Sequence, residues 1–210
     1  PAKLSHGHIK ALSQMQLDAI FYPCLTYNFD EHKGDNHFNC PVVAYSPELL
    51  RANITKLSEV SFLYPYFGLH RPKDFVRKAY EYFHKLDAEI TRGEIKSAAK
   101  KAYAAYFRWQ EELKEEGARA LQYAKENGKQ VFVLAGRPYH IDPEINHGLD
   151  RMISSFGIVI VSEDCVADLV SPQKVQVLNQ WTYHSRLYNA AKYCTQHENA
   201  ELVQLVSFGC

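Results

Sequence analysis

The stretch "QVFVLAGRPYHIDPEINHGLDRMISSFGIVIVSE", residues 130–163, decides the fold class. Its two ends, 130–136 and 157–163, are short apolar runs rich in β-branched residues and bounded by turn or cap residues, which is typical of buried strands. Between them, Asp142 and Pro143 have the residue types of a helix N-cap and first turn, so a helix is predicted over 142–157. Strand, helix, strand with continuously apolar strands predicts a parallel pair covered by a helix.

The same alternation recurs along most of the chain. Further strands are predicted at 18–23, 41–46, 60–67 and 202–209, the third being the weakest because Pro65 cannot donate to a central ladder. Further helices are predicted at 4–16, at 46–55 with Ser46 as N-cap and Pro47 in the first turn, and at 176–196. The predicted class is therefore α/β, with Rossmann-like parallel sheets covered by helices on both faces.

Residues 73–127 differ from this pattern, because they carry no strand signal. Apolar residues recur there at three- and four-residue steps among Glu, Lys and Arg, which predicts two long amphipathic helices with a break near Gly93. We therefore predict a first α/β lobe over 1–72, a helical arm or subdomain over 73–127, and a second α/β lobe over 128–210. The chain begins with Pro1 and stops at Cys210 directly after a predicted strand, so we expect it to be a segment of a longer protein.

Composition excludes several classes of protein. The 210 residues are 46% hydrophobic, which is enough for a sizeable core, and the 24 basic residues equal the 24 acidic ones. No block of like charge indicates a nucleic-acid or membrane partner, and no apolar run is long enough to span a bilayer. We expect a soluble, cytoplasmic protein with reduced thiols, since five cysteines are too sparse for a disulfide scaffold.

The cysteines are the first candidates for chemistry. Cys24 and Cys210 directly follow predicted strands, where open parallel sheets present their functional loops, and Cys40 closes the polar loop that Cys24 begins. Thiolates at such positions could bind an iron–sulfur cluster or zinc, but no CxxC is present and ordinary buried thiols are the alternative. Cys165 also follows a strand and stays unassigned, whereas Cys194 falls in a helical pattern and is predicted to be structural.

A second group of candidates surrounds the two strands of residues 130–163. Arg137 and His140 line the turn after the first strand, where an arginine beside a helix N-terminus suits a carboxylate or phosphate. Glu163 follows the second strand and is a candidate acid–base group, although such acids also serve as helix caps. No GxGxxG, P-loop or GxSxG motif is present, so the sequence gives no support for nucleotide hydrolysis or serine esterase chemistry.

Several long stretches together resemble one family: "DAIFYPCLTYNFDEHKGDNHFNCPVVAYSPELLRAN" (18–53), "LAGRPYHIDPEINHGLD" (134–150), "VSEDCV" (161–166), "WTYHSRLYNAAKY" (181–193) and "LVQLVSFGC" (202–210). It is the 2-hydroxyacyl-CoA dehydratase and CoA-substrate-specific enzyme activase-related group of anaerobic bacteria, in particular the module that follows the activator ATPase domain in long fused proteins. The resemblance implies Rossmann-like lobes and a [4Fe–4S] cluster held by three cysteines. Carried over to this chain, these are Cys24 of "YPC", Cys40 of "FNCP" and Cys210 of "SFGC".

The resemblance also implies a role for the module. It would receive an electron from the ATP-dependent activator domain, as part of a 2-hydroxyacyl-CoA dehydratase-like lyase or an ATP-dependent reductase, with an acyl-CoA as a possible substrate. The ATP-binding motifs of the activator are absent from the sequence, so this segment by itself is not expected to hydrolyse ATP. A second hypothesis is a non-catalytic Rossmann-like docking module for an acyl-CoA or a partner subunit, in which the cysteines are incidental.

Overall fold

The computed structural model describes residues 2–206, which form two compact units. Unit 1 contains residues 2–30 and 37–102, and unit 2 contains residues 31–36 and 103–206. Each unit holds its own sheet, and every strand pair in both sheets is parallel. The predicted α/β class is therefore confirmed.

Unit 1 is built around two short strands, β1 (Ile20–Phe21) and β2 (Phe62–Leu63), and the pairing continues to a bridge between Cys24 and Tyr66. Unit 1 also contains helix α1 (Ala2–Leu12), helix α2 (Pro41–Asn53) and the 3-10 turn η1 (Thr55–Ser58). The core of the unit is a cluster of apolar side chains from these elements: Ile9, Ile20, Leu50, Ile54, Leu57 and Phe62.

The strand predicted over 41–46 is wrong, because helix α2 begins at Pro41. Pro41 stands in the first turn, where its missing N–H costs nothing, and the Cys40 carbonyl accepts the N–H groups of Val43 and Ala44. Ser46 and Pro47 therefore lie inside the helix rather than at its start, and the Ser46 hydroxyl bonds back to the Val42 carbonyl. The helix therefore starts six residues earlier than predicted, at Pro41 instead of Pro47, in spite of the local β-branched run.

The two long helices predicted for the middle of the chain are present. They are α3 (Pro72–Leu86) and the 35-residue α4 (Arg92–Glu126). A capping box starts α4: the Thr91 hydroxyl accepts the Glu94 N–H at 3.2 Å, and the Glu94 carboxylate accepts the Thr91 N–H at 2.8 Å. Residues of α4 from Tyr103 onward belong to unit 2.

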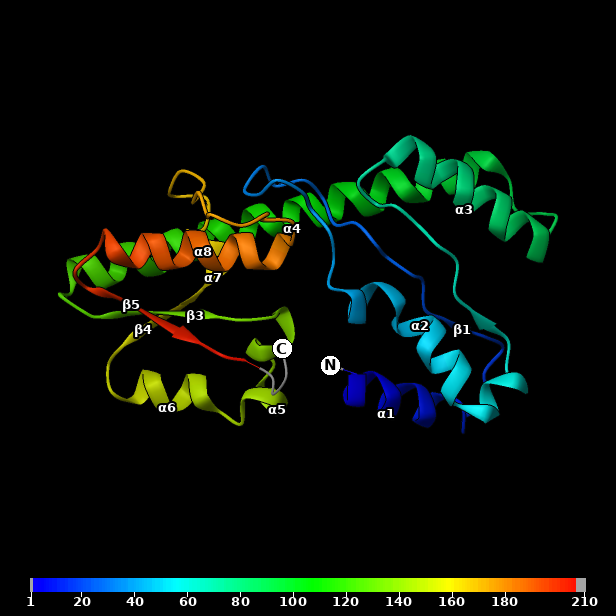
Figure 1. The fold of residues 1–210 in the computed structure, drawn as a ribbon, viewed down its shortest axis with the longest axis horizontal. Helices are drawn as coiled ribbons and strands as arrows, with labels where there is room; N and C mark the ends of the chain where they lie inside the picture. The colour runs from blue at the N-terminus through cyan, green and yellow to red at the C-terminus, as the bar shows by residue number, and fades with distance from the viewer. Residues whose placement is uncertain (1, 207–210) are drawn as a thin grey trace. The chain divides into compact units, whose positions relative to one another are not determined.

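Unit 2 has a three-stranded sheet in the order β4–β3–β5, formed by β3 (Val131–Ala135), β4 (Val159–Ser162) and β5 (Ala200–Gln204). Helix α8 (Thr182–Thr195) and the second part of α4 lie on one face of this sheet and α6 (Leu149–Ser155) on the other (Figure 1). The core gathers Ala124, Val131, Val133, Val161, Cys165, Val166, Ala190, Tyr193 and Ala200. The strand predicted over 202–209 corresponds to β5, which starts two residues earlier, at Ala200. The last three residues of the predicted strand lie outside the described residues.

Two predicted helices are shorter in the structure. The Asp142 carboxylate caps α5 (Pro143–Asn146) as predicted, accepting the Glu144 N–H at 2.9 Å, but His147 and Gly148 take left-handed backbone angles and separate α5 from α6. The helix predicted over 176–196 starts at Thr182. The backbone of Asn179 bonds to residues 35 and 36 instead, which keeps it out of a helix.

Candidate functional site

Cys24 lies at the end of the extended segment that contains β1. Its N–H donates to the Pro65 carbonyl at 2.9 Å, and its own carbonyl accepts the Phe67 N–H at 3.1 Å. The side chain is fully buried, and this burial raises the pKa of the thiol, although a hydrogen bond with the Tyr66 side chain opposes the shift. Hydrogen bonding to Glu48 and burial raise the pKa of Tyr66 in turn.

The polar loop between Cys24 and Cys40 folds back on itself. Tyr27 and Phe38 form an antiparallel bridge, and the Asn39 N–H donates to the Thr26 carbonyl at 2.9 Å. The Asn39 side-chain amide, which is buried, donates to the Leu25 carbonyl, also at 2.9 Å. These contacts bring the residues next to Cys24 and Cys40 together, and Cys40 then stands at the N-terminus of α2.

The described residues do not complete a metal centre. Over residues 2–206, no group of three or more His, Cys, Asp or Glu side chains is placed to hold a metal ion. Cys210, the third predicted ligand, lies outside the described residues. Cys165 packs in the core of unit 2 with its sulfur 3.7 Å from the Leu113 carbonyl, and Cys194 packs against the same core, so both have structural surroundings.

The tip of the polar loop, residues 31–36, belongs to unit 2. The Asp35 N–H donates to the Asn179 carbonyl at 2.7 Å, and the Asp35 carboxylate accepts the Asn179 N–H at 2.8 Å. Gly34 lies so close that a Cβ there would come within 2.6 Å of both the Asn179 carbonyl oxygen and the Ser185 hydroxyl. The tip is therefore a fixed part of unit 2.

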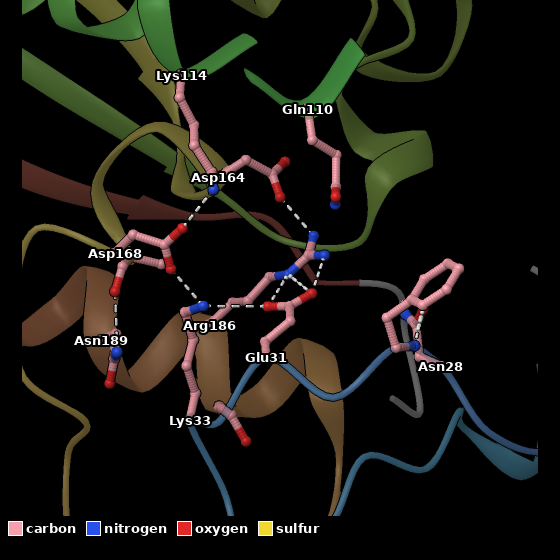
Figure 2. A network of polar contacts seen from close by, with 12 residues as sticks. Asn28, Glu31, Lys33, Gln110, Lys114, Asp164, Asp168, Arg186 and Asn189 are labelled. Atoms are coloured by element: carbon pink, nitrogen blue, oxygen red, sulfur yellow. Dashed lines mark hydrogen bonds and ion pairs between the residues drawn. The ribbon is translucent and has the colours of Figure 1, made fainter. Parts of the chain in front are cut away.

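Arg186 on α8 is the centre of a charged network at this tip (Figure 2). Its Nε donates to the two carboxylate oxygens of Glu31 at 2.9 and 2.8 Å, and its Nη1 pairs with Asp164. Burial lowers the pKa of Arg186, but the hydrogen bonds to Glu31 and the charge of Asp164 outweigh it, and the pKa lies above its ordinary value. Burial raises the pKa of Asp164, which Arg186 partly offsets.

A second set of ion pairs adjoins the first. Asp168 pairs with Lys33 and, at 2.8 Å, with Lys114 of α4 (Figure 2). Burial raises the pKa of Asp168, but its hydrogen bonds to these two lysines outweigh burial and lower it. The charged residues of both sets line a cavity of about 470 Å³. Its other lining side chains are largely aromatic or apolar, including Tyr106, Trp109, Leu113, Pro138, Ile141 and Tyr183.

The structure places Arg137, His140 and Glu163 at the carboxyl ends of β3 and β4. The Arg137 N–H donates to His140 Nδ1 at 2.9 Å, and Glu163 is hydrogen-bonded to the backbone of Gly136. His140 is 8% exposed. Burial lowers its pKa, and the positive charge of Arg137 lowers the pKa further. Glu163 is 3% exposed, and burial, reinforced by Asp164, raises its pKa to about 7. A carboxyl with such a pKa can hold or release a proton near neutrality.

Comparison with known proteins places the chain in a family. The model of a family described as the CoA enzyme activase uncharacterised domain matches residues 1–166. This chain belongs to that family. The matched part of this activase-family domain includes Cys24, Cys40 and Glu163, whereas Cys210 and Arg186 lie beyond it. No curated protein and no solved structure is detectably similar to the chain. Among residues 2–206, none of the helices combines the length and the hydrophobicity that a membrane-spanning segment requires.

Sequence reasoning missed the centre of the charged network in this activase-family domain. Arg186 occupies the buried side of α8 together with Asn189 and Ala190. A charged residue in register with the apolar positions of a helix is the available signal for a buried ion pair, because burying an unpaired guanidinium is costly. Its partner Glu31 stands 155 positions earlier in a polar loop, where no sequence pattern marks a residue as part of a buried ion pair.

Proposed function

We propose that the chain is the iron–sulfur redox module of an acyl-CoA dehydratase activase-related protein. In this proposal Cys24, Cys40 and Cys210 hold a [4Fe–4S] cluster, and the cluster receives electrons from an ATP-dependent activator domain. Membership of the CoA enzyme activase family supports the connection to an activase. The chain itself has no ATP-binding motif, so the activator would be a separate domain or protein.

The fold-back of the polar loop is the observation that carries the proposal. The 15 residues between the two cysteines form a loop whose base is closed by the contacts of Asn39 to Thr26 and Leu25. Both thiols then belong to unit 1 and lie at the ends of one closed loop. Soft thiolate ligands from such a loop suit an iron–sulfur cluster, which is held by cysteines.

The surroundings of the two thiols fit this role. Binding requires the thiol of Cys24 to lose its proton, and because burial raises its pKa, cluster assembly would release a proton and be favoured at higher pH. Tyr66 is hydrogen-bonded to Cys24 and would orient the sulfur and tune its charge. Cys40 precedes a 13-residue helix, whose N-terminus stabilises nearby negative charge. A bound cluster would supply one-electron transfer, and the chain would supply ligands and a desolvated surrounding.

Anaerobic reconstitution with iron and sulfide tests the proposal. We expect a brown protein with about four irons per chain. Cys24→Ala, Cys40→Ala and Cys210→Ala should each lose most of the iron and the visible absorbance, while Cys194→Ala, the matched control, should keep both. Unchanged iron in both Cys24→Ala and Cys40→Ala would refute the assignment, and zinc found in protein purified without added metal would replace the cluster by a zinc site.

A docking module for an acyl-CoA or a partner subunit is the second candidate function, and the cavity of unit 2 favours it. At about 470 Å³ it has the size of a small-molecule site, and its lining combines aromatic and apolar side chains with six charged ones. Pro138, Ile141 and Asp164 line it and are near neighbours in sequence of Arg137, His140 and Glu163, which we propose as ligand-binding residues. Calorimetric titration of iron-free protein with an acyl-CoA tests this candidate: saturable binding without iron supports an acyl-CoA docking site, and the absence of binding would refute it.

A further inference from the structure

The first turn of α8 in unit 2 lacks a side-chain cap. Its N-cap residue is Trp181, whose side chain accepts no hydrogen bond from the helix, and the Trp181 carbonyl accepts the Ser185 N–H at 3.0 Å. The N–H groups of Thr182 and His184 precede that first intrahelical bond, so they have no acceptor within the helix. A 14-residue helix that starts in this way presents backbone donors and a partial positive charge at its N-terminus.

Two buried side-chain atoms at the same helix end have no hydrogen-bond partner among residues 2–206: Thr182 Oγ1 and His184 Nδ1. Thr182 is 3% exposed, so its hydroxyl cannot be satisfied by bulk solvent. Side chains of a helix lean toward its N-terminus, and a hydroxyl at the first helical position is therefore directed at this end. Buried polar atoms are almost always hydrogen-bonded in native proteins, so this pair indicates a missing partner.

Arg137 reaches the same place from the loop after β3. Its Cζ lies 5.5 Å from the centroid of the Tyr183 ring. Tyr183 stands between Thr182 and His184 in the sequence. Figure 1 shows why the two segments meet: α8 runs opposite to β3, so its first turn lies at the carboxyl end of the sheet. Arg186 lies 5.1 Å from the same ring and pairs with Glu31 and Asp164.

From this geometry we infer that the N-terminus of α8, the Thr182 hydroxyl, His184 and Arg137 form a binding site for an oxyanion, the carboxylate or phosphate group of a small ligand. The backbone N–H groups, the hydroxyl and the guanidinium are all donors, and oxyanions are the ligands that accept several such bonds at once. The site lies in unit 2 and is independent of the cysteines, so it stands whether or not a cluster is bound.

The electrostatics of His184 agree with an anion site. Burial lowers the pKa of His184, and the charge of Arg137 lowers it further. An anion bound between the two would offset the effect of Arg137 and raise that pKa, so the protein should take up protons on binding when the pH lies near the histidine pKa. A site for water alone would leave the pKa of His184 in place.

Titration of the 210-residue chain with inorganic phosphate, followed by amide NMR at constant ionic strength, tests the site. We expect saturable shifts of the Thr182 and His184 amides and an upward shift of the His184 pKa. A parallel titration with acetate distinguishes a carboxylate site from a phosphate site. Saturable shifts with either anion support the inference, while shifts that sodium chloride reproduces, or no saturable shift with either anion, would overturn it.

Variants assign the binding to these residues. Arg137→Gln removes a charged donor and should weaken binding by about tenfold to a hundredfold. Thr182→Val keeps the side-chain shape, removes the hydroxyl and should weaken binding by about threefold to tenfold. Arg119→Gln, on the exposed side of α4 and paired with Glu116, is the control and should not change it. If Arg137→Gln does not fold, the Thr182→Val variant and the wild-type titration decide, and unchanged affinity in Thr182→Val together with an unmoved His184 pKa refutes the site.

Discussion

Arg186→Met would leave the carboxylates of Glu31 and Asp164 together in unit 2 without the guanidinium that lies between them. The three side chains are 9%, 17% and 23% exposed respectively, so water replaces the lost contacts poorly. Each charged hydrogen bond contributes about 1.5–3 kcal/mol, and breaking a buried pair typically costs about 3–5 kcal/mol. We therefore expect the free energy of unfolding of unit 2 to fall by about 3–5 kcal/mol.

The loss should depend on pH in a defined direction. Burial already raises the pKa of Asp164, and Arg186 lowers it, so the variant should have a still higher Asp164 pKa. A carboxyl whose folded pKa exceeds its unfolded pKa loses stability as the pH rises from the unfolded value through the folded one. The deficit of Arg186→Met should therefore be smallest at acid pH, where Asp164 is protonated, and largest at neutral pH.

Urea unfolding followed by tryptophan fluorescence measures the stability of unit 2. Trp109 and Trp181 are the two tryptophans of the chain, and both belong to this unit. Arg119→Met, an exposed arginine in the same unit, is the control and should show no measurable change. Adding Glu31→Gln to Arg186→Met should recover part of the loss. A deficit below about 1 kcal/mol, or one that grows toward acid pH, would contradict the buried-network argument.

Two further predictions concern unit 2. Gly34→Ala places a Cβ 2.6 Å from the Asn179 carbonyl oxygen and the Ser185 hydroxyl, so it should destabilise the unit by about 1–3 kcal/mol in the same urea experiment, and wild-type stability would refute the close approach. The pKa of Glu163 is about 7 against an ordinary 4.5, so stability should decline by about 3 kcal/mol as the pH rises through this interval. Glu163→Gln should abolish that decline and make the chain more stable than wild type above neutral pH. If the stability of Glu163→Gln depended on pH in the same way as that of wild type, the Glu163 carboxyl would not be buried as described.

The strands and caps that a local pattern can specify were predicted from the sequence. The runs at 130–136 and 157–163 contain β3 and β4, and Asp142 caps α5, because strand burial and capping depend on residues that are close in the chain. The start of α2 was missed for a related reason. "PVVAYS" carries both a β-branched run and a proline suited to the first helical turn, and the local pattern does not choose between them.

The α/β class and the activase-related family of this chain could be predicted from the sequence alone. Which polar groups meet depends on the folded chain: Glu31 meets Arg186, Asp35 meets Asn179, and Arg137 meets the first turn of α8. Backbone propensity acts over a few residues, whereas a buried charge is stabilised by whatever partner the folded chain brings to it. Glu31 and Arg186 are 155 positions apart in the sequence, and Asp35 and Asn179 are 144 apart. No local sequence pattern carries information over such a separation.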